Sequence, residues 1–155
     1  MKNKFLSIFF LILSPLYFCQ NIIKIEFHHS NAMILFKSVD ILFEPIKNNK
    51  KEKIKIKVKK DRGEEYFLKI PKEKFRDIYN ACMKIKFDTV AVRNMIHGSA
   101  SRISLYDDLG NNKSYYATGL GKRSKNDKSQ KDFWYATKLI LKAADLKMED
   151  LISYR

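Results

Sequence analysis

The segment KIKIKVK, residues 53–59, alternates between lysine and β-branched residues. Successive side chains of a strand point to opposite faces of a sheet, so this spacing separates the two kinds of residue. The apolar residues face inward, and four lysines, called the lysine stripe below, face outward: Lys53, Lys55, Lys57 and Lys59. The segment therefore predicts a half-buried strand with one charged face.

Other segments also have the patterns of strands. Residues 22–28, IIKIEFH, place Ile23, Ile25 and Phe27 on one face and polar residues on the other. Further strands are expected near 39–45, at 66–70 across a turn at 61–63, and in a hairpin of 101–107 and 114–119 across the turn DLGNN.

Two segments have the spacing of amphipathic helices. Pro71 suits the first turn of a helix, and the apolar residues after it recur every three or four positions: Phe75, Ile78, Tyr79, Cys82 and Ile85. A second helix is expected after Ser129, since Ser129-x-x-Asp132 fits a capping box, with a buried face of Phe133, Ala136, Ile140 and Ala143 or Ala144. Strands joined by short turns and packed by helices predict an α+β fold, an antiparallel sheet of about five or six strands with two main helices on one face.

Residues 1–19 have the pattern of a secretory signal peptide. Lys2 and Lys4 precede the nine-residue apolar run FLSIFFLIL, and Ser14 and Pro15 end it. A membrane span needs about 20 apolar residues, which this run does not provide. We expect cleavage after Cys19 and an exported, periplasmic or secreted domain of residues 20–155 that has no membrane span. A lipid anchor on Cys19 is the alternative, although its motif prefers a small residue where Phe18 stands.

The chain is strongly basic, with 31 Lys and Arg residues against 17 Asp and Glu residues and a net charge of +14. Residues 1–19 contain two of the bases and no acid, so the remaining 136 residues carry +12. That length suits one domain. Residues 47–60 alone hold eight lysines and a single acid, Glu52.

Neither the cysteines nor the histidines form a familiar catalytic or metal motif. Cys82, the single thiol after residue 19, lies in an apolar stripe and is expected to be an inert core residue. His28 and His29 are adjacent in a strand and point to opposite faces, so they cannot share a metal, and we expect partly exposed structural histidines. No zinc spacing is present, and no cofactor is expected.

Residues 96–102, IHGSASR, form the polar loop that most invites a catalytic interpretation. His97 as base and Arg102 as phosphate clamp are the candidates for a small secreted hydrolase such as a nuclease. The hypothesis lacks a second acid–base group, and Gly98 also suits a simple turn before the next strand.

The lysine stripe supports the first hypothesis, a non-catalytic exported protein that binds an anionic surface or an acidic protein. Nucleic acid is a further candidate, with Tyr106, Tyr115 and Tyr116 available for stacking if they share the face of the lysines. The alternative is a solvated face or an edge strand guarded by lysines against aggregation. The sequence does not indicate the oligomeric state.

The motifs FCQ near residue 20, HGSASRISL with YYATG, and FWYATKLILKAADL give the chain a family resemblance. It resembles small exported bacterial proteins that have a signal peptide and an α+β domain. The resemblance implies the architecture and no activity.

Overall fold

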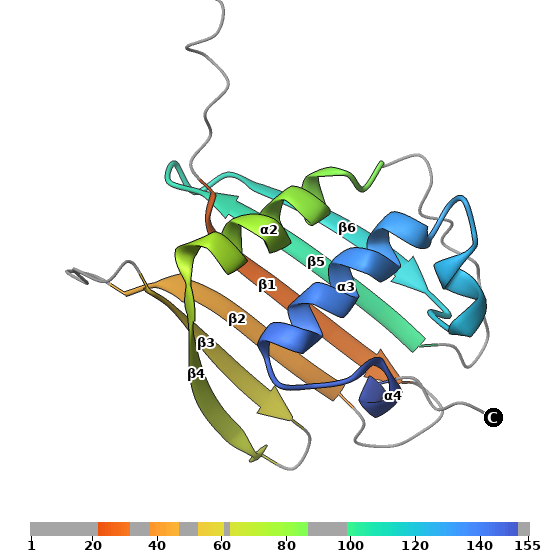
Figure 1. The fold of residues 1–155 in the computed structure, drawn as a ribbon, viewed down its shortest axis with the longest axis horizontal. Coiled ribbons are helices and arrows are strands. Elements are labelled where there is room, and N and C mark those ends of the chain that lie inside the picture. Colours follow the sequence, from red (N-terminus) through yellow and green to blue (C-terminus); the bar gives the residue numbers. More distant parts are fainter. Residues whose placement is uncertain (1–21, 32–37, 47–52, 61–62, 87–98, 152–155) are drawn as a thin grey trace, which may run out of the picture.

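The computed structural model describes residues 22–31, 38–46, 53–60, 63–86 and 99–151 of the chain. They form the predicted α+β fold, an antiparallel six-stranded sheet with two main helices on one face (Figure 1). The strands are β1 (Ile22–Asn31), β2 (Ser38–Pro45), β3 (Lys53–Lys60), β4 (Glu65–Pro71), β5 (Ser99–Asp107) and β6 (Asn112–Thr118). Their order across the sheet is β4-β3-β2-β1-β5-β6, so the first strand lies in the interior of the sheet.

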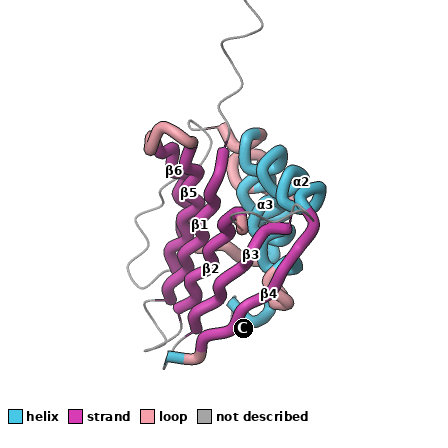
Figure 2. Tube along the Cα trace, turned by 90° about the vertical axis from the view of Figure 1, so that its left-hand side faces the viewer, coloured by secondary structure: helices cyan, strands magenta, loops and turns pink. Residues whose placement is uncertain are grey.

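The helical layer consists of α2 (Lys72–Met83) and α3 (Lys131–Ala143), followed by the short α4 (Met148–Leu151). A 3₁₀ turn, η4 (Lys122–Lys125), lies between β6 and α3. Seen from the side, α2 and α3 lie on one side of the sheet, and no other described element covers the opposite side (Figure 2). We call that side the open face.

The core lies between the sheet and the two helices. In β3, Ile54, Ile56 and Val58 are buried, as the alternation of the sequence predicts. The predicted stripe of α2 is also confirmed, because Phe75, Ile78, Cys82 and Ile85 are buried and Tyr79 packs against the core. In α3 the buried face consists of Phe133, Ala136, Thr137, Ile140 and Leu141, with Ala144 just beyond the helix.

The position of β3 corrects one interpretation of the lysine stripe. β3 pairs with β2 on one side and with β4 on the other, over registers such as Ile56 with Phe43 and with Leu68. It is therefore not an edge strand, and guarding an open edge does not explain its lysines. The solvated-face alternative remains.

Two predicted details were wrong. β5 begins at Ser99, two residues before the predicted strand of 101–107, so Ser99 belongs to the strand and not to the polar loop before it. α3 begins after Gln130 with no side-chain cap, and Ser129 instead hydrogen bonds to Asp127 through its backbone N–H and its hydroxyl, at 2.8 and 2.6 Å. Because the Ser129 hydroxyl is bonded to Asp127, it does not cap α3 as predicted.

Several predictions lie outside the described residues. They are the signal peptide at 1–19 with Cys19, the lysines of 47–51, and His97. Among the residues that the structure describes, no helix is both long and apolar enough to cross a membrane.

Candidate anion-binding face

Register across the sheet brings charged side chains from distant segments into rows on the open face. Directly opposite residues of antiparallel strands point to the same side. One row runs across all six strands, from β4 to β6: Glu65, Lys59, Asp40, His28, Arg102 and Tyr116. The next row runs Phe67, Lys57, Leu42, Glu26, Ser104 and Ser114. Residues as far apart as Lys59 and Arg102 therefore belong to one surface.

The lysine stripe lies on this face as predicted, but its members have different surroundings. Lys57 Nζ lies 3.0 Å from Glu65 Oε2. Lys55 Nζ lies 4.2 Å from the centroid of the Phe67 ring, which is half exposed, and Lys55 stands between Glu44 on β2 and Lys69 on β4. The stripe is thus part of a mixed surface and not a continuous line of free positive charge.

Bases outnumber acids on the open face. Among the described strand residues, the bases are Lys24, Lys53, Lys55, Lys57, Lys59, Lys69 and Arg102, and the acids are Glu26, Asp40, Glu44 and Glu65. Glu26 and Glu65 each have a lysine as ion-pair partner, and Asp40 lies 2.6 Å from His28 Nδ1, a contact that is an ion pair only when His28 is protonated. Neither the Lys59 nor the Arg102 side chain has a hydrogen-bond or ion-pair partner among the described residues.

Glu26 is the acid most firmly held. It lies 2.7 Å from Lys24 Nζ and accepts a hydrogen bond of 2.7 Å from the Tyr106 hydroxyl. Burial alone would raise the pKa of its carboxyl, but the hydrogen bonds from Lys24 and Tyr106 outweigh burial and keep that pKa below its usual value. The same contact with Glu26 raises the pKa of the Tyr106 hydroxyl. Glu26 is therefore ionised at neutral pH, and both of its carboxylate oxygens have a partner.

The two adjacent histidines have different environments, which corrects the expectation that both are partly exposed. His28 lies on the open face, where its Nδ1 is 2.6 Å from Asp40 Oδ1. His29 faces the core, is 1 % exposed and has its Nδ1 2.8 Å from Ser101 Oγ. Asp40 is thus the partner of His28. No group of three or more His, Cys, Asp or Glu side chains among the described residues is arranged to hold a metal ion.

Arg102 is separated from the serines with which sequence reasoning grouped it. Ser101 is buried on the inner face, whereas Arg102 is exposed on the open face, opposite His28. The hydrolase hypothesis stays a prediction, since His97 is not among the described residues. Of the three tyrosines considered for stacking, Tyr106 and Tyr116 lie on the open face, but Tyr115 is buried in the core.

A shallow depression of about 310 Å³ lies on the open face, where the two rows pass over the central strands. The charged or titratable side chains that line it are Glu26, His28, Asp40, Lys57, Lys59 and Arg102. Sequence reasoning named Arg102 and the two lysines but not Glu26 or His28 as binding residues.

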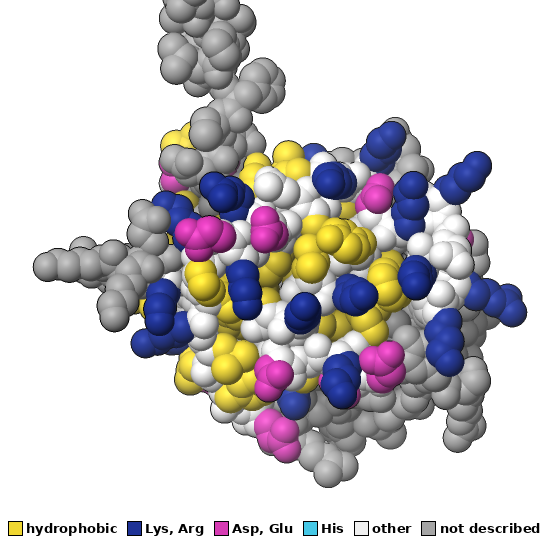
Figure 3. Space-filling view, viewed as in Figure 1, with side chains coloured by type: hydrophobic (Ala, Val, Ile, Leu, Met, Phe, Trp, Pro, Cys, Tyr) yellow, Lys and Arg dark blue, Asp and Glu magenta, His cyan; other side chains and the backbone are white. Residues whose placement is uncertain are grey.

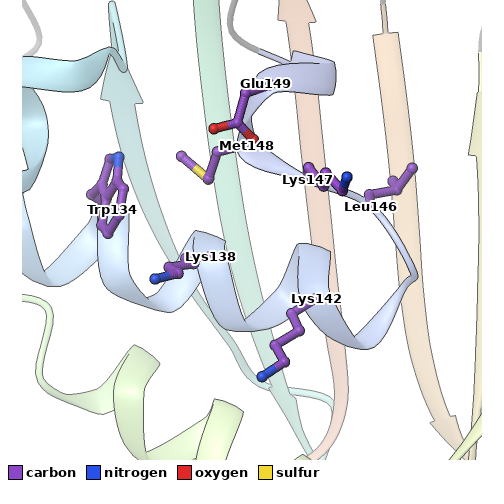
Figure 4. Close-up of a pocket in the computed structure, with 7 residues that line it drawn as sticks. All are labelled: Trp134, Lys138, Lys142, Leu146, Lys147, Met148 and Glu149. Atoms are coloured by element: carbon purple, nitrogen blue, oxygen red, sulfur yellow. The ribbon is translucent and has the colours of Figure 1, made fainter.

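A second depression, of about 290 Å³, lies beside α3. Figure 4 shows Trp134, Lys138 and Lys142 along α3, with Leu146 to Glu149 on the segment that follows. Lys138 Nζ lies 5.6 Å from the centroid of the Trp134 ring. Lys and Arg side chains also surround an apolar patch on the helix face (Figure 3). Positive charge therefore occurs on both faces, and net charge alone does not identify a binding surface.

Comparison with known proteins adds no relative. No family model, no curated protein and no solved structure matches the chain.

Proposed function

We propose that the protein binds an anionic partner through the open face of its sheet. The main support is an excess of positive charge on this face, which no other described element covers. The excess remains after most of its carboxylates are paired with a basic side chain. Lys59, Lys69 and Arg102 have no ion-pair partner among the described residues and are therefore available to a ligand. The half-exposed rings of Phe67 and Tyr116 add apolar surface between the charges.

The arrangement supports a polyanion better than a single carboxylate. Bases lie on β1, β3, β4 and β5, so they are spread across the sheet and along the strands. Neighbouring strands lie about 4.8 Å apart, and every second residue of one strand is about 6.6 Å away. A chain of repeated negative charges can contact several such positions at once, releasing bound counterions from the partner.

Charge substitution with a matched control tests the proposal. The sheet-face variant replaces Lys53, Lys55, Lys57 and Lys59 with Gln. The control variant replaces four exposed lysines of α2 and α3 with Gln: Lys74, Lys131, Lys138 and Lys142. Both variants lose four charges, so a difference between them reports the face and not the net charge.

The measurement is retention on immobilised heparin as a function of NaCl concentration. For nucleic acids, each lost phosphate contact reduces the steepness of log K against log salt by roughly 0.7–0.9, and on the same scale four lost contacts with heparin should reduce it by about 3 units. The helix-face variant should stay close to the unmodified protein. Equal losses in the two variants would remove the open face from the proposal.

We also propose that the protein acts outside the cytoplasm after residues 1–19 are removed. The support is the sequence pattern of that segment alone. N-terminal sequencing of the protein recovered from the periplasm or the medium should begin near Gln20. A cytoplasmic product that retains Met1 or the residues after it would contradict the proposal.

A further inference from the structure

We propose that the depression around His28 is a binding site for a tetrahedral oxyanion of the phosphate or sulfate type, and that the anion binds together with a proton on His28. The inference rests on the proposed function, since it names a specific site and ligand chemistry within the open face. It concerns six side chains of four strands and not the lysine stripe as a whole.

Two available cations flank the site. Lys59 of β3 and Arg102 of β5 lie in the same row, on either side of Asp40 and His28. Their α-carbons are three strand spacings apart, about 14 Å, and both long side chains line the depression between them. Because neither side chain has an ion-pair partner among the described residues, an incoming anion need not displace one.

The acids that line the depression already have partners. Glu26 is held by Lys24 and by the Tyr106 hydroxyl, both at 2.7 Å. Asp40 lies 2.6 Å from His28 Nδ1. These contacts reduce the repulsion that either carboxylate would exert on an anion.

His28 can change the charge of the site. Its Nδ1 faces Asp40, and its Nε2 has no hydrogen bond among the described residues. With Nδ1–H donating to Asp40, a neutral imidazole has only a lone pair at Nε2, which repels an anion. The protonated ring has an N–H at Nε2, which donates to an anion.

The other groups that face His28 are set by the register of its two neighbouring strands. Arg102 lies opposite it on β5, Asp40 lies opposite it on β2, and Glu26 precedes it by two residues on β1. Lys57 and Lys59 reach the same depression from β3. An oxyanion between Arg102 and a protonated His28 would therefore meet positive charge on both sides.

The donors favour a tetrahedral anion over a planar carboxylate. Arg102, His28 and Lys59 come from three strands and all line the depression. A carboxylate presents two oxygens in one plane, which one guanidinium satisfies by a paired contact. A phosphate or sulfate group presents oxygens in several directions and can use all three donors.

The test uses inorganic sulfate as the probe, because it remains a dianion across pH 5 to 8. NMR spectra of the full-length labelled protein are recorded as sulfate replaces chloride at constant ionic strength, at pH 6 and pH 7.5. We expect shifts at His28 and Arg102 and an affinity that falls by up to tenfold per pH unit, the limit for one linked proton. His28→Gln should remove the pH dependence, and Arg102→Gln should weaken binding at both pH values. Arg123→Gln, a matched substitution on η4, should leave binding unchanged.

Three outcomes would overturn the inference. They are no shift beyond that of chloride, shifts confined to the helix face, and an affinity that is equal at the two pH values. If sulfate fails while the sheet-face lysine variant still loses heparin retention, the site is wrong and the proposed function stands. If sulfate binds as expected but the two lysine variants behave alike on heparin, the oxyanion site stands without a polyanion surface. Comparing polyphosphate with heparin at equal charge then separates a phosphorylated source from a sulfated one.

Discussion

Burial of Cys82 makes a quantitative prediction about its reactivity. The side chain is 0 % exposed in the core, and burial raises the pKa of the thiol from 9.0 to about 12. The thiolate is the reactive form, and at pH 8 its fraction falls from roughly one in ten to roughly one in ten thousand. A disulfide reagent should therefore react with Cys82 about 1,000-fold more slowly in the folded protein than in denaturant.

The assay follows the release of the coloured leaving group at pH 8 from a Cys19→Ser variant, in which Cys82 is the single thiol. The reaction in denaturant is the control. A folded-state rate within tenfold of the denatured rate would refute the reasoning, since it would require an accessible or readily ionised thiol.

The same pKa difference makes stability depend on pH. The folded-state pKa lies above the unfolded one, so the contribution of the neutral thiol is complete below pH 9 and is lost as pH rises toward 12. The stability advantage over Cys82→Ala should shrink by about 1.4 kcal/mol between pH 8 and pH 10. Urea unfolding of both proteins measures this difference, and parallel pH curves would contradict it.

Three further substitutions test the fold. Ile56→Ala removes a fully buried side chain of β3 and should lower the free energy of unfolding by about 2–5 kcal/mol, measured by denaturant titration. Tyr66→Phe removes the 2.8 Å hydrogen bond from the hydroxyl to the Ala144 carbonyl and should cost about 1 kcal/mol in the same assay, whereas an unchanged midpoint would show that this bond adds nothing. Hydrogen bonds from Asn111 lower the pKa of the Asp107 carboxyl, so this carboxylate stabilises the protein above about pH 4 and the effect is lost as pH falls. Asp107→Asn should flatten the acid limb of the stability curve.

The sequence predicted the strands and their faces well because alternation is a local property. The pattern at 53–59 correctly showed which side chains of β3 are buried. It did not show the neighbours of β3, since alternation is the same for an edge strand and an interior one. The interpretation of the lysines as edge protection was wrong for that reason.

The candidate site could be predicted only in part, because its members meet through long-range pairing. His28 and Arg102 are 74 residues apart and lie opposite each other only because β5 pairs with β1. Nothing in the local spacing of either segment indicates that register. The contact between His28 and Asp40 was easier to predict, since the two residues lie in strands that follow each other in the sequence.

The interior position of β1 has a consequence for the nascent chain. β1 to β4 can pair in the order in which they leave the ribosome. The second edge of β1 stays unpaired until β5 is synthesised, because Phe27 of β1 pairs with Ile103 of β5, 76 residues later in the chain. Until then, a strand that carries Ile25 and Phe27 presents open backbone N–H and C=O groups. A translation product that stops before Ser99 should therefore self-associate, and a chaperone that delays β1 until the final hairpin emerges should raise the yield of folded protein.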